Sequence, residues 1–371
     1  MEVFIKFLKL LLISVRVLIL GLLSLLIRPF KRKKKELEKN LEKILIIGLS
    51  RIGDNVASIP AIKNLKENFP DSKIFIFLNN YLEGFWEVVG YIDRVIYYRD
   101  ENFIKKIKLI REYSPYDLVI DFTCDYTFNG AFLAYFSNSK YKIGYNILFR
   151  GFLFDIPLKV RKKKQHVVEQ ILRLIEPLKI KIKGRIPKIE ITNKIEKLKE
   201  KIFSELELIE RNLKIGIHPG GYYPSQRWDI EKFVELCNKL FEKYNTQIIL
   251  IFGKREEEFI EKMAKFLKKN PVIFYNKSIP ELIGLISGLD ILICNNSGPL
   301  HIASGLGIPT VSLMGPTDPI KWAPLGEKNI VIRKDLPCSP CKKGYCKKHT
   351  CMKLITVEEV FEKVRKVING K

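Results

Sequence analysis

The 371-residue sequence predicts an α/β protein made of two Rossmann-like domains that face each other across a cleft. Apolar runs of strand length alternate with amphipathic stretches of helix length, which is the pattern of parallel α/β sheets. This alternation fades near residue 180 and starts again at Leu213. The chain is also long enough for about two domains, each able to bury its own core.

The change in composition along the chain predicts five segments. They are a membrane-associated helix with a basic block at 1–40, an N-terminal Rossmann-like domain at 41–180, a linker at 181–212, a C-terminal Rossmann-like domain at 213–355, and a C-terminal helix at 356–371. The last helix has the spacing of an amphipathic element that could cross back to the first domain.

Composition narrows the class of partner. A hydrophobic content of 47% excludes a disordered chain, and the net charge of +24 indicates an anionic partner. Nucleic acid, acidic lipid and phosphorylated sugars all fit this charge. Lysines spread through helices usually form a solvated surface, so charge alone does not choose between these partners.

The N-terminal segment indicates membrane association. Residues 1–28 are apolar apart from five charges, and the basic block 31–35 follows. The longest uncharged run, 17–27, is well short of the about 20 residues of an unbroken spanning helix. The pattern favours a helix in the membrane interface; a tilted span and a buried N-terminal helix are the alternatives. The basic block predicts that the rest of the chain lies on the cytoplasmic face of the inner membrane.

In the first domain, a continuous apolar run at 44–49 predicts a parallel strand buried on both faces, followed by a turn and a helix that ends near 68. Asp54 follows this first strand, at the sheet edge where α/β proteins bind ligands. Helix capping is the plain structural alternative for this residue. The other predicted strands are 73–78, 94–98 and 117–122, and the other helices are 103–113 and 130–136.

The second domain repeats this alternation. Predicted strands are 214–218, 247–252, 272–275 and 291–294, and predicted helices are 229–244, 256–267, 280–289 and 300–306. The stretch 291–319 reads as strand, tight turn, helix and strand, with Pro299 suited to the first helical turn. Free N–H groups and the positive end of the dipole make such a helix start a seat for a diphosphate, although many α/β turns have the same pattern without a ligand.

Two motifs carry a resemblance to a known family. N-S-G-P-L-H, A-S-G-L-G-I-P-T and G-P-T-D-P near the end, with S-R-I-G-D-N-V-A-S-I-P-A near the start, resemble the ADP-heptose:lipopolysaccharide heptosyltransferases, glycosyltransferase family 9. The resemblance covers about 44–368 and implies the GT-B fold and inverting chemistry. It implies that Asp54 is the catalytic base, that Gly53 lets the acceptor approach the backbone, and that Ser50 and Arg51 line the same edge.

The resemblance also implies a donor site in the second domain. Gln226 stands where the family has a phosphate-contacting Lys, and Asn296 stands where it usually has Asp. Arg227 could still supply a cation. The implied donor-binding residues are Gln226, Arg227, Glu257, Asn296, Ser297, Gly298 and His301.

The function implied by the resemblance is transfer of heptose from ADP-heptose to a lipid A-core type acceptor of the lipopolysaccharide inner core. No cofactor or metal is expected for this reaction, and no D-x-D motif lies near the donor loops. One alternative is a different nucleotide-sugar donor, which the departures at Gln226 and Asn296 leave open. Another is a basic nucleic-acid-binding protein, although no recognition helix or RNA-binding aromatic motif is apparent, so no nucleic-acid partner is expected.

Four of the seven cysteines form a C-x2-C-x4-C-x4-C pattern near the C-terminus. They are Cys338, Cys341, Cys346 and Cys351. Tetrahedral thiolate ligation of Zn²⁺ fits this pattern, and so do unligated or redox-labile thiols, because the spacing matches no common zinc finger.

Overall fold

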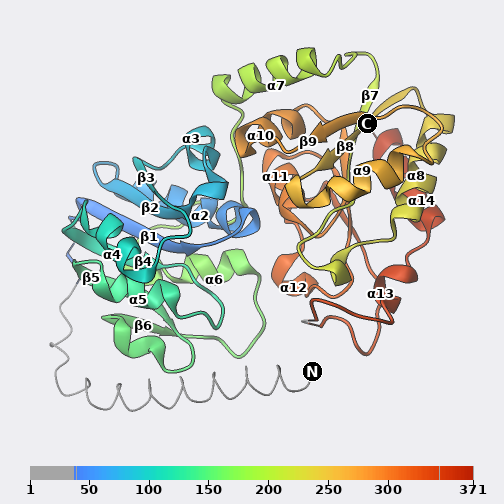
Figure 1. The fold of residues 1–371 in the computed structure, drawn as a ribbon. Coiled ribbons are helices and arrows are strands. Elements are labelled where there is room, and N and C mark those ends of the chain that lie inside the picture. The colour runs from blue at the N-terminus through green and yellow to red at the C-terminus, as the bar shows by residue number, and fades with distance from the viewer. Residues whose placement is uncertain (1–36, 39, 342, 371) are drawn as a thin grey trace.

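The structure is a computed structural model in which residues 37, 38, 40–341 and 343–370 are described (Figure 1). The predicted membrane-associated segment 1–40 therefore lies almost wholly outside the described residues. Among the helices that are described, none is both long and apolar enough to cross a bilayer.

The first domain is a six-stranded parallel sheet in the order β3-β2-β1-β4-β5-β6. Side chains of β1 alternate between its two faces, so that Ile44 and Ile46 join one core while Leu45 and Ile47 join another. Both faces are therefore buried, as the continuous apolar run predicts. The strands are β1 (Lys43–Leu49), β2 (Lys73–Asn79), β3 (Arg94–Tyr98), β4 (Tyr116–Asp121), β5 (Ser139–Asn146) and β6 (Ile156–Lys159).

Helices cover both faces of this sheet. Helices α4 and α5 pack on one face, and α2 and α6 pack on the face nearer the second domain (Figure 1). The helices are α2 (Ile52–Asn68), α3 (Phe85–Val89), α4 (Phe103–Arg111), α5 (Asn129–Phe136) and α6 (Val167–Arg173), with 3₁₀ turns at Asn80–Leu82, Arg150–Leu153 and Glu176–Leu178.

The second domain repeats the architecture with a six-stranded parallel sheet in the order β12-β11-β10-β7-β8-β9. The prediction of two Rossmann-like α/β domains is confirmed. The strands are β7 (Leu213–His218), β8 (Thr246–Phe252), β9 (Val272–Tyr275), β10 (Ile291–Asn295), β11 (Thr310–Leu313) and β12 (Asn329–Ile332).

The final helix does not cross back to the first domain. Helix α14 packs on α8 and β11 of the second domain, where Val357, Val360 and Val364 are buried. That part of the prediction is wrong, because an amphipathic pattern gives the apolar face of a helix and not its partner. The helices are α7 (Asn193–Glu205), α8 (Ile230–Lys243), α9 (Glu257–Ala264), α10 (Ile279–Ser287), α11 (Gly298–Leu306), α12 (Pro319–Trp322), α13 (Thr350–Lys353) and α14 (Val357–Asn369), with 3₁₀ turns at Pro224–Gln226 and Lys254–Glu256.

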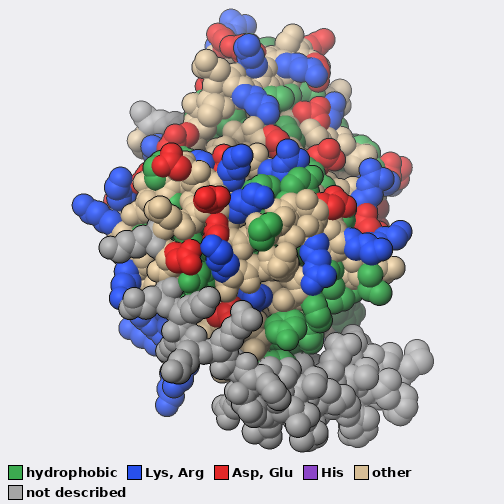
Figure 2. Space-filling model, turned by 90° about the vertical axis from the view of Figure 1, so that its left-hand side faces the viewer, with side chains coloured by type: hydrophobic (Ala, Val, Ile, Leu, Met, Phe, Trp, Pro, Cys, Tyr) green, Lys and Arg blue, Asp and Glu red, His purple; other side chains and the backbone are tan. Residues whose placement is uncertain are grey.

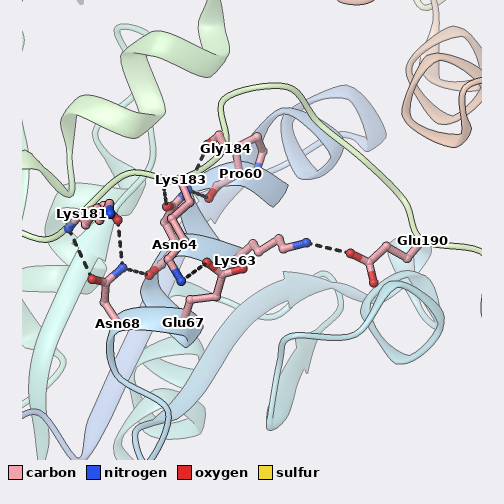
Figure 3. A network of polar contacts seen from close by, with 9 residues as sticks. All are labelled: Pro60, Lys63, Asn64, Glu67, Asn68, Lys181, Lys183, Gly184 and Glu190. Atoms are coloured by element: carbon pink, nitrogen blue, oxygen red, sulfur yellow. Dashed lines mark hydrogen bonds and ion pairs between the residues drawn. The ribbon is translucent and has the colours of Figure 1, made fainter.

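The chain that leaves the first domain is held against α2 by a polar network (Figure 3). The buried Asn64 donates to the Gly184 carbonyl at 3.0 Å and accepts from the Lys183 amide at 2.7 Å. Lys63 adds an ion pair with Glu190 at 2.7 Å, also visible in Figure 3. The start of the linker therefore has a fixed path across the first domain.

The hydrophobic core is continuous between the domains. One cluster includes Val56 and Ile59 of α2 together with Ile302 and Ala303 of α11. Helices α2 and α11 are in direct contact across the domain boundary. The starts of these two helices carry the two motifs, so this contact sets the geometry between them.

The basic charge is not concentrated on the outer face of the first domain. Figure 2 shows Lys and Arg side chains there interspersed with Asp and Glu. Ion pairs of the first domain include Lys66 with Asp93 at 3.0 Å and Lys140 with Asp117 at 3.2 Å. This face therefore has the mixed surface of a solvated protein and no uniform basic patch.

Candidate active site

The β1–α2 turn positions Asp54. Strand β1 ends at Leu49, Arg51 is extended at the N-cap, and Asp54 lies in the first turn of α2. Its carboxylate accepts a hydrogen bond of 3.3 Å from the Ser50 hydroxyl. Removal from water raises the pKa of Asp54 to about 6, against the lowering effects of the Arg51 cation and the Ser50 hydrogen bond. A carboxylate with this pKa is suited to accept a proton near neutral pH.

The buried Asn55 fixes this turn. Its amide donates to the Arg51 carbonyl at 2.8 Å, and its side-chain oxygen accepts from the Trp86 indole at 2.8 Å. Asn55 and Trp86 are both almost fully buried. No local sequence pattern singles out Asn55, although a polar residue on a face of α2 that is otherwise apolar is a signal of such a role.

The predicted diphosphate seat is formed by the β10–α11 turn. Ser297 is the extended N-cap of α11, and its side chain donates to the Asn295 carbonyl and leaves the first N–H groups of the helix uncapped. Asn296 is half-buried and donates to the Trp322 carbonyl at 3.4 Å. Because the first turn of a helix has free N–H donors, Ser297 and Gly298 give this turn the chemistry of an anion site.

The two turns face each other at close range. A Cβ on Gly53 would lie 2.9 Å from a ring carbon of His301, and a Cβ on Gly298 would lie 2.8 Å from the Cδ1 of Ile52. Two segments nearly 250 residues apart in sequence therefore meet across the domain boundary, and only glycine permits so close an approach at either point. The contact therefore places Asp54 and the start of α11 side by side.

His301 packs in this contact as a neutral imidazole. Its ring lies against Gly53 and meets Trp322 at an angle, with ring centroids 5.9 Å apart. Burial, with a smaller contribution from His166, lowers the pKa of His301 to about 4. At neutral pH this residue can therefore offer a hydrogen bond to a phosphate but no charge.

The loop 219–229 after β7 is called the donor loop here, because the resemblance implies that it contacts the donor. It is anchored by a buried residue that no sequence pattern identifies. Asn295 donates to the carbonyls of Pro219 and Gly220 at 2.7 and 3.0 Å, and it accepts from the Trp228 amide at 3.1 Å. Trp228 is itself a buried core residue. Asn295 thus joins the end of β10 to both sides of the loop after β7.

Two predicted donor-binding side chains already have partners in their own domain. Gln226 donates to the Thr317 hydroxyl at 3.1 Å. Arg227 donates to the Gly221 carbonyl at 2.9 Å, and its guanidinium lies 5.2 Å from the Phe259 ring centroid. In this conformation these contacts of both side chains lie within the second domain, and none of them is with the start of α11.

Glu257 is exposed at the start of α9, where it interacts with the Tyr275 hydroxyl. The neighbouring Glu256 is the carboxylate that faces the donor loop. It accepts from the Gly253 amide at 2.9 Å, and its side chain fills the space in which a Cβ on Gly220 would stand. The contacts therefore join Glu256 to the loop and leave Glu257 outside this group, so a ribose contact by Glu257 stays a prediction.

Arg51 links the site across the domain boundary. Its guanidinium lies 4.5 Å from the ring centroid of Tyr222, which belongs to the donor loop of the second domain. On the other side of the turn, the Tyr81 hydroxyl donates to the Ser50 carbonyl. Ser50, Arg51 and Gly53 are thus gathered around Asp54.

The basic residues 161–164 and His166, which precede α6, contact the second domain. Lys164 forms an ion pair with Asp318 at 2.9 Å, and the Nε2 of His166 is 2.9 Å from the Ala323 carbonyl. The Nδ1 of His166 accepts from the Val168 amide at 3.2 Å, so the ring is neutral with its proton on Nε2. This run therefore holds the segment around α12 in place.

The seven cysteines, all within the described residues, are free thiols. Cys338, Cys341 and Cys346 lie near enough to Cys351 to raise the pKa of its thiol, after the larger effect of burial. Among the described residues, which leave out residue 342, no three or more His, Cys, Asp or Glu side chains are arranged to hold a metal ion. Metal binding and unligated thiols both stay predictions for this loop.

Comparison with known proteins agrees with this architecture. The chain is 26% identical to lipooligosaccharide heptosyltransferase 2 of Campylobacter jejuni, over 85% of this chain and 96% of that protein. Its fold is similar to that of E. coli ADP-heptose lps heptosyltransferase II, with a TM-score of 0.74, 21% identity, and coverage of 88% of this chain and 99% of the other. It is also similar to E. coli heptosyltransferase WaaC solved with ADP, with a TM-score of 0.67, 18% identity, and coverage of 88% and 99%. These likenesses identify the GT-B fold.

A family model matches residues 104–352, about two thirds of the chain, and is described as glycosyltransferase family 9 (heptosyltransferase). The match includes the donor loop, the β10–α11 turn and the cysteine-containing loop. The β1–α2 turn with Asp54 lies before it and is joined to the matched part by the contacts of Gly53 and Gly298. The protein is therefore a glycosyltransferase of the GT-B fold and belongs to family 9, the heptosyltransferases.

Proposed function

We propose that this enzyme transfers heptose from ADP-heptose to a core acceptor of lipopolysaccharide, with inversion at the anomeric carbon. The proposal rests on one observation. The turn that carries Asp54 packs directly against the start of α11, so that a base and a diphosphate seat lie close together at the domain boundary. A bound sugar could contact both at once.

The proposed reaction is a single displacement. Asp54 takes the proton of an acceptor hydroxyl, and the hydroxyl oxygen forms a bond to the anomeric carbon of the heptose. The bond between that carbon and the diphosphate oxygen breaks, and its electron pair leaves on ADP. The first N–H groups of α11 stabilise the charge that develops on the diphosphate. Attack from the side opposite the leaving group inverts the anomeric carbon.

The donor is inferred from the family and from the shape of the second domain. A matching fold has been solved with ADP, and the family is described as heptosyltransferase. The acceptor class is inferred from relatives that are named as lipopolysaccharide or lipooligosaccharide heptosyltransferases. Position 226, where Gln replaces the expected Lys, makes donor choice the part of the proposal to test first.

The acceptor lipid and the apolar, basic segment 1–40 together support a location on the cytoplasmic face of the inner membrane. This is checked by fusing residues 1–40 to a reporter protein and fractionating cells. A reporter that stays out of the membrane fraction argues against the location.

The decisive experiment is mass spectrometry of products from ADP-heptose, UDP-sugars and GDP-sugars, each mixed with Kdo-bearing lipid A. We expect heptose addition from ADP-heptose alone, and NMR of the product should show the inverted anomeric configuration. Efficient transfer from a UDP- or GDP-sugar would replace the proposed donor.

Substitution of Asp54 tests its role as base. Asp54→Ala should lower kcat at least about 100-fold, the lower end of general-base effects, while the affinity for ADP stays unchanged. Asp71→Asn removes an exposed carboxylate in the turn after α2 and serves as the matched control. An Asp54→Ala enzyme with kcat close to that of the wild type would exclude this carboxylate as the base.

A further inference from the structure

A cavity of about 280 Å³ lies beside Asp54, on the acceptor side of the cleft. This volume is near the lower end of small-molecule pockets, about 300 to 1,000 Å³. The first domain supplies most of the lining, from the ends of β1 and β4 and from α5 and α6. Polar side chains of Ser50, Thr123, Thr127 and Asn129 stand among aromatic and aliphatic ones. The mixture suits a sugar ring, which has hydroxyl groups and apolar C–H faces.

The second domain adds two residues to this lining, Lys321 and Trp322 of α12. Lys321 is half-buried, and its ammonium is 5.7 Å from the Trp322 ring centroid. Within the described part of the chain, this ammonium has no hydrogen bond and no ion pair. Burial raises the pKa of Asp54, and the Lys321 charge is among the effects that lower it. A half-buried ammonium whose N–H groups have no acceptor is costly, unless a ligand supplies one.

The other charges of the cavity have partners. The Arg51 guanidinium lies over Tyr222 and beside Asp54. The Asp125 carboxylate accepts from the amide and the hydroxyl of Thr127, at 2.9 and 2.7 Å. Arg51 also hydrogen-bonds to the Tyr223 side chain, whereas among the described residues no acceptor takes a hydrogen bond from the Lys321 ammonium.

Contacts from the first domain hold α12 in place. Asp318 caps α12 by accepting from the Ile320 amide at 3.1 Å, and the same residue pairs with Lys164 at 2.9 Å. Just after α12, the Ala323 carbonyl is 2.9 Å from the His166 ring. These contacts on both sides of Lys321 set the position from which its side chain enters the cavity.

We propose that Lys321 binds an anionic substituent of the acceptor sugar, a carboxylate or a phosphate monoester, and so orients the acceptor hydroxyl toward Asp54. The inference rests on the proposed function and adds a specificity-determining residue to it. The donor diphosphate is a poorer candidate for this lysine, because the cavity is lined mostly by the first domain and by none of Asn296, Ser297 and Gly298.

The test separates acceptor binding from donor binding. Lys321→Met should raise the KM for Kdo-bearing lipid A about tenfold or more, as expected for loss of a charged hydrogen bond, and leave kcat within about threefold. The KM for ADP-heptose and the Kd for ADP should not change. Lys321→Arg should restore the acceptor KM to within about threefold. Lys366→Met removes an exposed lysine of α14 and is the charge-matched control.

Modified acceptors identify the anionic group. The wild type should lose about tenfold in kcat/KM on the acceptor that lacks the recognised anion, either a carboxyl-reduced form or a dephosphorylated form. The Lys321→Met enzyme should not distinguish that acceptor from the intact one. If the substitution raises the Kd for ADP, or if it lowers activity equally on all acceptors, the acceptor role is wrong. A wild type that transfers no heptose at all overturns the proposed function, whereas an active enzyme with an unchanged acceptor KM in Lys321→Met overturns this inference alone.

Discussion

At the residue scale, the charge of Asp54 is set by competing effects within one turn. Loss of water raises its pKa to about 6, while Arg51 and Ser50 favour the ionised form. A base must be ionised to accept a proton, so this balance decides the pH range of activity. A carboxylate with an ordinary pKa would be ionised at lower pH but would be a weaker base.

These effects predict an acid limb in the pH profile. As pH falls through about 6, Asp54 becomes protonated and kcat/KM should decrease about tenfold per pH unit. Arg51→Gln removes the cation that stabilises the carboxylate, so the limb should move to higher pH. The measurement is kcat/KM from pH 5 to 8.5, with turnover monitored as the release of ADP.

Arg51→Lys provides the control, because it keeps the positive charge and should leave the limb near its wild-type position. The position of the limb is compared, and not the height of the curve, since Arg51 also contacts Tyr222. A limb that stays at the same pH in Arg51→Gln would mean that a group other than Asp54 titrates.

At the element scale, the two consecutive residues Asn295 and Asn296 have different roles. Asn295 is fully buried and makes three hydrogen bonds to the donor loop and to Trp228. Asn296 is half-buried, with one long hydrogen bond to Trp322. One side chain therefore holds the loops together, while the other is only lightly tied to its own domain.

This difference predicts opposite phenotypes. Asn295→Leu leaves two carbonyls and one amide without partners and should lower the free energy of unfolding by about 2–4 kcal/mol. Asn296→Ala should change stability by less than about 1 kcal/mol and still reduce kcat/KM. Thermal melting and steady-state kinetics of both variants, measured together, check the assignment. Equal losses of stability in the two variants would refute it.

The elements that sequence alone predicts are those with one dominant signal. Strands β1 and β10 are uninterrupted apolar runs, and α11 begins at a Gly-Pro pair and ends at Gly307. Strands β5 and β6 were not predicted. Strand β5 mixes lysines with apolar residues, and β6 contains Pro157, which is tolerated because β6 is an edge strand. These two segments form strands because they pair with a neighbouring strand, and no local sequence pattern shows that pairing.

The same limit applies to the site. Asp54, Ser297 and Gly298 lie in motifs that can be recognised in the sequence, and the structure brings their turns together. Lys321 enters the cavity from the opposite domain, and Glu256 faces the donor loop because of the way the 3₁₀ turn after β8 folds back. Contacts of this kind depend on tertiary packing, so spacing along the chain does not predict them.

At the scale of the whole molecule, the two domains share one hydrophobic cluster and meet at the starts of α2 and α11. The reacting groups are supplied half by each domain, so catalysis requires this contact to form. Gly298 and Ile52 form part of this contact, and there is no space for a side chain at Gly298. A change in packing at this point should therefore affect turnover while leaving each domain folded.

The pair Gly298 and Ile52 allows that dependence to be measured. A Cβ on Gly298 would stand 2.8 Å from the Cδ1 of Ile52, so Gly298→Ala should push the two helix starts apart. Overpacking of this kind costs about 1–3 kcal/mol, equivalent to about a 5- to 150-fold loss of kcat/KM if the whole cost falls on the active arrangement. Ile52→Val removes the Cδ1 atom but keeps the Cβ, which would lie 3.1 Å from the added Cβ, so the double variant should recover part of the lost activity. Because Ile52→Val alone only deletes a methyl group, its kcat/KM should stay within about threefold of the wild type. Additive losses in the double variant would show instead that Gly298→Ala acts on the diphosphate seat and not on the approach of the two domains.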